Sequence, residues 1–222
     1  MDSSVLQRYL TEVINQYRFA VLSLEMLRKS LDLHDLDIPD DKSVDDYVFL
    51  YAHAFLTHVA SISKLLWPEA RTRQRRPLAE ERSEELRSIL NISEDSPINN
   101  RRLRNHFEHY DERLDEWASE ERRYYIDRII APIGTISGFD DKDYMRRFDP
   151  TTFQLFFHGE SFDLLEAEKE IMIIGRSALD TRREIDAFPK GMLHAVCPEC
   201  EKVRWDTSLT CSYCGAPVFE EF

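Results

Sequence analysis

The stretch from Ile98 to Ser119, INNRRLRNHFEHYDERLDEWAS, has the apolar spacing of an amphipathic helix and is the most informative part of the chain. At about 100° per residue its apolar side chains fall on one stripe, namely Leu103, Phe107, Tyr110, Leu114, Trp117 and Ala118. The opposite side collects polar and charged side chains, namely Arg101, Arg104, Asn105, Glu108, His109 and Glu112. The pattern predicts a helix with one face in a core and one face open to solvent.

Start and stop signals bound this predicted helix. Ser96 and Pro97 suit the cap and the first turn of a helix. The helical pattern continues through Arg122 to Ile130. Helix-breaking residues then follow, namely Pro132, Gly134 and Gly138.

The six residues 104–109, RNHFEH, resemble the Arg-polar-three residues-His signature of HEPN domains, which are helical bundles found in many RNases. The resemblance implies a HEPN-like, up-and-down helical bundle over residues 1–190. Two other registers exist, from Arg101 to His106 and from Arg102 to His109. We prefer Arg104 to His109, because Asn105 supplies the polar residue directly after the arginine and because His106 borders the apolar stripe.

The resemblance implies a metal-independent endoribonuclease that acts as a homodimer on an RNA substrate, with Arg104, Asn105 and His109 as catalytic residues. An imidazole titrates near neutral pH, so His109 would take the 2′-hydroxyl proton or protonate the leaving oxygen. Arg104 would neutralise the phosphate, and Asn105 would orient the phosphate or His109. The resemblance also implies a 2′,3′-cyclic phosphate product and a role as a toxin or antiviral-defence RNase, with an antitoxin or defence-system partner.

Acidic side chains surround the motif, namely Glu108, Asp111, Glu112, Asp115 and Glu116. They disfavour a polyanion unless a dimer cleft screens them. Two alternatives therefore stay open. One is a non-catalytic HEPN-like dimer that serves as a scaffold or partner-binding subunit, and the other is a zinc-ribbon adaptor that docks on a protein or nucleic acid. The face can also be an ordinary hydrated surface, with Arg104 and Glu108 as an i,i+4 pair.

All four cysteines lie near the end of the chain, as Cys197-Pro-Glu-Cys200 and Cys211-Ser-Tyr-Cys214 with ten residues between the pairs. Two such turns present four thiolates to one ion, which is the donor set of a closed, structural zinc site. The segment resembles a zinc ribbon, with Gly215 allowing a tight turn. Iron in a rubredoxin-like site and two disulfides are the alternatives. We expect one structural zinc per chain and no catalytic metal. Zinc binding would supply the free energy that folds this short segment.

Outside these motifs the pattern predicts further helices and one hairpin. Apolar residues recur at helical spacing over residues 4–31, 43–67, 78–91 and 165–187. Ser43 with Asp46 resembles a capping signal for the second of these helices. Residues 139–150 are typical of a charged turn, and residues 152–157 and 161–164 flank a turn at residues 158–160, as in a hairpin. The fold class expected is mainly α, with a small β-hairpin.

Each of the remaining groups of histidines and arginines has a functional and a structural interpretation. His53 and His58 are five residues apart and so fall on different faces of their helix, which favours core or boundary histidines over metal ligands. The basic run at residues 71–76 contains four arginines. We interpret it as a solvated loop, with an RNA-phosphate patch as the alternative.

Chain length and net charge limit the class of protein. In 222 residues, 29 Lys and Arg against 42 Asp and Glu give a net charge of −13, which disfavours a broadly basic nucleic-acid surface. The length accommodates a helical domain at residues 1–190 and a small zinc ribbon at residues 191–222. The chain shows neither a signal-peptide pattern nor a long uncharged apolar run, so we expect a soluble, cytoplasmic protein without a membrane partner.

Overall fold

The computed structural model describes residues 3–35, 43–68, 76–100, 110–119, 126–132, 134–139, 143–187, 195–196, 199–200, 203–204, 211 and 213–215. Within these ranges the chain is mainly helical, with a four-stranded sheet, a two-stranded ribbon and a cluster of cysteines near the C-terminal end. The mainly helical class with a small sheet is therefore confirmed. The likeness to the HEPN bundle stays a prediction.

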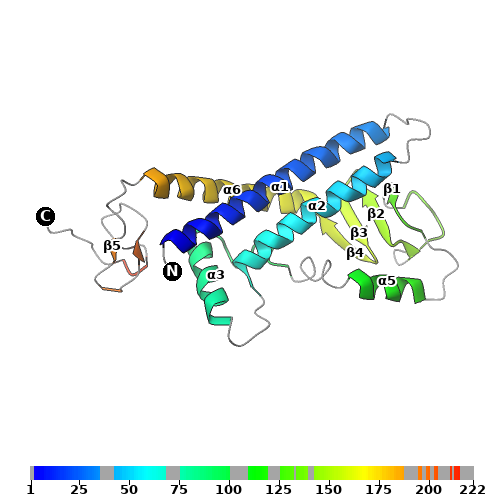
Figure 1. Ribbon diagram of the computed structural model, residues 1–222. Coiled ribbons are helices and arrows are strands. Elements are labelled where there is room, and N and C mark those ends of the chain that lie inside the picture. Colours follow the sequence, from blue (N-terminus) through cyan, green and yellow to red (C-terminus); the bar gives the residue numbers. More distant parts are fainter. Residues whose placement is uncertain are drawn as a thin grey trace.

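Two long helices form the centre of the fold. Helix α1 spans Ser3–Asp35 and helix α2 spans Ser43–Leu66, and they lie side by side (Figure 1). The pair is antiparallel, because Gln16 in the first half of α1 contacts His58 in the second half of α2, while His34 near the end of α1 contacts Asp45 near the start of α2. Both helices agree with the predicted ranges.

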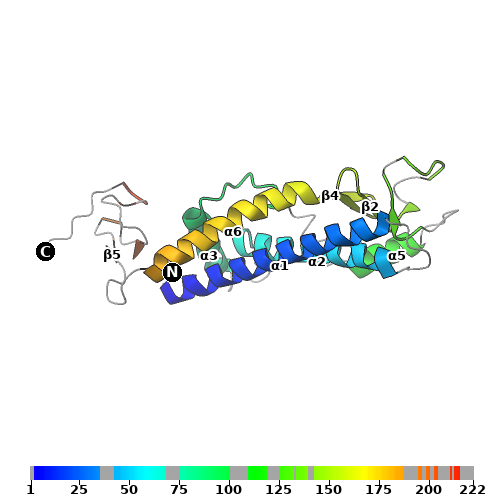
Figure 2. The same cartoon turned by 90° about the horizontal axis from the view of Figure 1, so that it is seen from above.

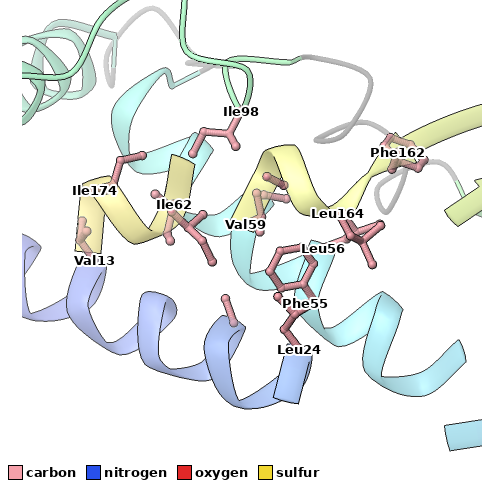
Figure 3. Close-up of a cluster of buried hydrophobic side chains, with 14 of the residues drawn as sticks. Val13, Leu24, Phe55, Leu56, Val59, Ile62, Ile98, Phe162, Leu164 and Ile174 are labelled. Atoms are coloured by element: carbon pink, nitrogen blue, oxygen red, sulfur yellow. The ribbon is translucent and has the colours of Figure 1, made fainter. Parts of the chain in front are cut away.

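Helix α6, Leu164–Ala187, packs along α1 and completes the core that α1 and α2 begin (Figures 1 and 2). The close-up in Figure 3 shows side chains from α1, α2 and α6 meeting in one apolar cluster. Gly175 lies where α6 meets α1, and a methyl group there would overlap the Tyr17 ring. The glycine therefore sets how closely these helices approach. The predicted final helix is confirmed, one residue longer at its start.

Helix α3, Arg76–Leu90, agrees with the third predicted helix and leads into an anchored loop. Ile98 is buried among α2 and α6 side chains (Figure 3). The Ser63 hydroxyl donates to the Ile98 carbonyl at 2.6 Å, and the Ser96 hydroxyl donates to the Glu170 carboxylate at 2.6 Å. Residues 96–100 are not helical and these tertiary contacts hold them in place, so the predicted start of the motif helix within residues 96–98 is wrong.

Helix α5, Tyr110–Ser119, is the described part of the predicted motif helix. Trp117 packs against the core, whereas Leu114 and Ala118, predicted on the same apolar stripe, are exposed. The helical pattern does not continue to Ile130. Ile126 instead pairs with Tyr144, and strand β1, Ile129–Ile130, pairs in parallel with strand β2. The β-branched isoleucines fit the pleated sheet better than a helix.

Strand β2, Arg146–Asp149, lies where the sequence predicts a charged turn over residues 139–150. Its charges are accommodated inside the protein. The Arg147 guanidinium lies over the Tyr144 and Phe156 rings, at 5.1 and 4.4 Å from their centroids. The Asp149 carboxylate accepts hydrogen bonds from the backbone and hydroxyl of Thr151, at 2.8 and 2.7 Å. Charge in the sequence therefore did not exclude a buried strand.

The predicted hairpin is confirmed as strand β3, Gln154–Phe157, and strand β4, Glu160–Asp163, in a sheet of order β1-β2-β3-β4. Its two-residue turn has positive φ at His158 and Gly159, 45° and 80°, as a type I′ turn requires. Strands β5, Ala195–Val196, and β6, Val203–Arg204, pair antiparallel near the cysteines. None of the described helices has the length and apolar character needed to cross a bilayer.

Candidate metal site and the flanks of the predicted motif

Three of the four predicted zinc ligands lie together. The sulfurs of Cys200, Cys211 and Cys214 are within 4.8 Å of one another, and Cys211 is buried. Among the described residues this is the one group of His, Cys, Asp and Glu side chains that could hold a metal ion. The fourth predicted ligand, Cys197, lies outside the described residues.

The local backbone brings the cysteines to one place. Pairing of β5 with β6 brings the segment before Cys197 beside the segment that follows Cys200. At the second pair, the Gly215 backbone N–H donates to the Cys211 carbonyl at 2.8 Å, and Gly215 has a φ of 71°. The left-handed conformation favours glycine, so the tight turn predicted after Cys214 is confirmed.

The sulfur spacing excludes a disulfide between Cys200 and Cys211. The Cys200 and Cys211 sulfurs are 3.7 Å apart, whereas sulfurs in a disulfide are about 2.05 Å apart. A tetrahedral site with metal–sulfur bonds of about 2.3 Å places neighbouring sulfurs about 3.8 Å apart. The observed distance therefore matches two ligands of one tetrahedral ion, and this pair of cysteines could hold a metal.

The predicted catalytic residues Arg104, Asn105 and His109 lie outside the described residues, as do the rival-register residues Arg101, Arg102 and His106. The structure describes both flanks of this segment. On one side Ile98 is buried and its carbonyl is bound by Ser63. On the other side α5 begins at Tyr110. The motif segment thus joins an anchored loop to a helix that packs on the core.

Helix α5 is tied to the sheet by charged side chains. Arg113 forms an ion pair with Glu160 of β4, at 3.0 Å between Nη1 and Oε2. The carboxylate of Glu116 lies 3.9 Å from Nδ1 of His158 in the β3–β4 turn. Three further acidic residues of α5 are exposed, namely Asp111, Glu112 and Asp115. One face of α5 is therefore docked on the sheet, and its solvent face is acidic.

A polar cluster that the sequence did not indicate lies between α2 and the sheet. Arg146 binds the Asp127 carboxylate through two hydrogen bonds of 2.8 and 2.6 Å. His53 lies edge-on to Phe157, with ring centroids 6.3 Å apart. Desolvation by burial lowers the pKa of His53 from 6.5 to about 4, with a further lowering by Arg146 that Asp127 opposes. The three polar residues come from distant parts of the chain, so no local spacing could have revealed them.

Neither histidine of α2 belongs to a group of metal ligands among the described residues. Nδ1 of His58 lies 2.8 Å from the Gln16 side-chain oxygen, and burial lowers the pKa of His58. His53 and His58 therefore behave as the core or boundary histidines that the sequence predicted. The predicted basic loop falls mostly on residues 69–75, which lie outside the described residues; Arg76 is exposed at the start of α3.

Comparison of this chain with protein-family models, with curated proteins and with solved structures gave no match.

Proposed function

We propose that Cys197, Cys200, Cys211 and Cys214 hold one structural zinc ion. The observation that carries this proposal is the 3.7 Å separation of the Cys200 and Cys211 sulfurs within a three-cysteine cluster. Two Cys-x2-Cys turns are the usual donor set for zinc, and four sulfur ligands leave no position for a substrate. The zinc would then stabilise the ribbon rather than take part in a reaction.

The test of this site is metal content together with local folding. Purified protein should contain one equivalent of zinc per chain by elemental analysis. Cys211→Ser should lose the zinc and unfold the ribbon, while the helical circular dichroism of the α1–α2–α6 core stays nearly unchanged. Ser212→Ala, which alters the same turn without removing a thiolate, is the matched control and should keep the zinc. Iron in place of zinc, or a Cys211→Ser protein that retains one equivalent, would contradict the assignment.

For the helical body we propose a metal-independent endoribonuclease activity through Arg104, Asn105 and His109. Support comes from the resemblance of residues 104–109 to the HEPN signature and from the position of this segment directly before α5. His109 would act as the general acid or base, and Arg104 would stabilise charge that develops on the phosphate. Two copies of the motif would act together in a dimer, as the resemblance implies.

Substitutions within the motif test this activity against its rival registers. His109→Ala and Arg104→Ala should each lower RNA cleavage by about 100-fold or more, because removal of one charge-stabilising or proton-transferring group typically costs several kcal/mol of barrier. His106→Ala is the matched control and should lower stability more than cleavage. Cleavage lost in His106→Ala and kept in His109→Ala would show that the register from Arg101 to His106 is correct.

A second candidate function is a docking adaptor without catalysis. The acidic surface residues of α5, Asp111, Glu112 and Asp115, favour it, because they repel a polyanion directly beside the motif. The net charge of −13 acts in the same direction. In that case the zinc ribbon and the helical face would bind a protein partner, such as an antitoxin or defence-system component. RNA that stays uncleaved during incubation with pure, folded protein would favour this candidate.

A further inference from the structure

The outer face of the α1–α2 pair carries large apolar side chains in contact with solvent. Phe19 and Leu22 of α1 are 50% and 56% exposed, and Leu50 of α2 is 56% exposed. Met26 is partly buried and falls on the same helical stripe as Phe19 and Leu22. A large apolar face that water covers is unfavourable, so its presence requires a reason.

The exposed apolar residues of the two helices lie at matching levels along the antiparallel pair. The rings of Phe19 and His58 have centroids 5.3 Å apart, which joins the two helices at one end of the face. In the antiparallel pair, the α2 residues that follow toward Asp45 lie at the level of successively later α1 residues, so Leu50 lies at about the level of Met26 along the pair. On α2 the stripe that continues from Leu50 holds small, uncharged residues, namely Ala54, Thr57 and Ser61.

The hydroxyl groups of this face already have partners within their own helices. On α2, Thr57 donates to the His53 carbonyl at 2.8 Å, and Ser61 donates to the Thr57 carbonyl at 2.9 Å. Removing water from the face therefore leaves these donors satisfied, and the usual penalty for burying a hydroxyl is avoided.

The charges at the edge of the face are arranged for self-association. Arg18 and Glu25 are both exposed and are seven residues apart on α1, so they share one edge of the helix. A twofold axis across α1 near Leu22 turns a second α1 antiparallel to the first. Arg18 of each copy then faces Glu25 of the other, and both opposite-charge pairs form in one symmetric arrangement.

We propose that a second copy of this chain covers the α1–α2 face, forming a symmetric dimer with Leu22 near the twofold axis and four helices at the interface. Tyr47 of α2, three residues before Leu50, is 46% exposed and belongs to the same face. Together with Phe19, Leu22 and Leu50 it exposes about 400 Å² of side-chain area, taking about 200 Å² for each fully exposed side chain. That is about half of the roughly 800 Å² that each partner buries in a standard interface. The small residues of the face and the flanking charges supply the rest.

This dimer uses the α1–α2 face and not the motif helix, and it does not depend on whether the protein cleaves RNA. Joint action of two motif copies, as the HEPN resemblance implies, would need a second interface. Light scattering after size exclusion should report a dimer at about 10 μM protein, and Leu22→Glu should raise the dissociation constant at least about 100-fold, because the substitution enters the interface twice. Arg18→Glu should weaken the dimer, and Arg18→Glu combined with Glu25→Arg should restore it, because the reversed pair is again complementary.

Two variants are the controls. Ile173→Glu on α6 adds the same charge at an apolar residue that is 59% exposed, and Leu114→Glu does so on α5. Both should leave the dimer intact. A wild-type monomer at about 100 μM, well above the concentration at which a standard interface associates, would overturn the proposal, even if the face were found to bind another protein. A dimer that Leu114→Glu disrupts and Leu22→Glu does not would overturn it too, and would place the interface on the motif helix.

Discussion

The environment of His53 shows how burial changes the chemistry of one residue. Its pKa is lowered to about 4, mainly by desolvation. Because the folded state binds the proton more weakly than the unfolded chain, the protonated fraction of the unfolded chain grows first as the pH falls below about 6.5. The stability that the neutral imidazole contributes is therefore complete above about pH 6.5 and is lost as the pH falls toward about 4.

We predict a loss of up to about 3 kcal/mol in the free energy of unfolding from this residue between about pH 7 and about pH 4. Urea denaturation of the wild type and of His53→Gln at several pH values measures it. The variant should show a weaker dependence on pH in this range, because glutamine does not titrate. Parallel pH profiles for the two proteins would mean that His53 is solvated in the folded state.

At the residue scale the sequence is informative where chemistry needs a fixed local spacing. The two Cys-x2-Cys pairs and Gly215 can be recognised from spacing alone, because the members of each pair are close together in the sequence. The cluster of His53, Arg146 and Asp127 cannot, since its members lie far apart along the chain and meet only through the packing of α2 on the sheet.

Among the elements, the long helices are predictable and the short strands are less so. The apolar stripes of α1, α2 and α6 repeat over many turns, which averages out single exceptions. Strand β2 has four residues and two of them are arginines, so its sequence resembles a surface turn. Arg147 can be buried in this strand because its guanidinium stacks on two aromatic rings, and a tertiary contact of this kind leaves no local signal in the sequence.

The contact between α1 and α6 gives a prediction at the same scale. Gly175→Ala should destabilise the protein by about 1–3 kcal/mol, because the added methyl group overlaps the Tyr17 ring. In an open helix the same change would stabilise by roughly 1 kcal/mol, so the sign of the effect is diagnostic. Thermal denaturation measures it. In a Tyr17→Ala background the substitution should become neutral or stabilising, and an unrelieved loss there would argue against this contact.

Over the whole molecule, the structure combines a helical body, a sheet that anchors α5, and a three-cysteine cluster that could hold a metal. The sequence pattern predicts the helices, the hairpin and the grouping of the cysteines. It does not predict the apolar α1–α2 face, because Phe19, Leu22 and Leu50 fit a helical pattern whether they are buried or exposed. Only the packing of α6 and the sheet on the other sides shows which stripe remains in water.

The proposed separation of roles, with zinc structural and the reaction metal-independent, has one direct measurement. RNA is incubated with purified wild-type protein and with His109→Ala, each in buffer with and without EDTA. We predict that the wild type cleaves RNA equally in both buffers and that His109→Ala cleaves in neither, since the proton transfer is assigned to an imidazole and not to a metal-bound water. Intact RNA with folded wild-type protein, or equal cleavage by His109→Ala, would contradict the proposal.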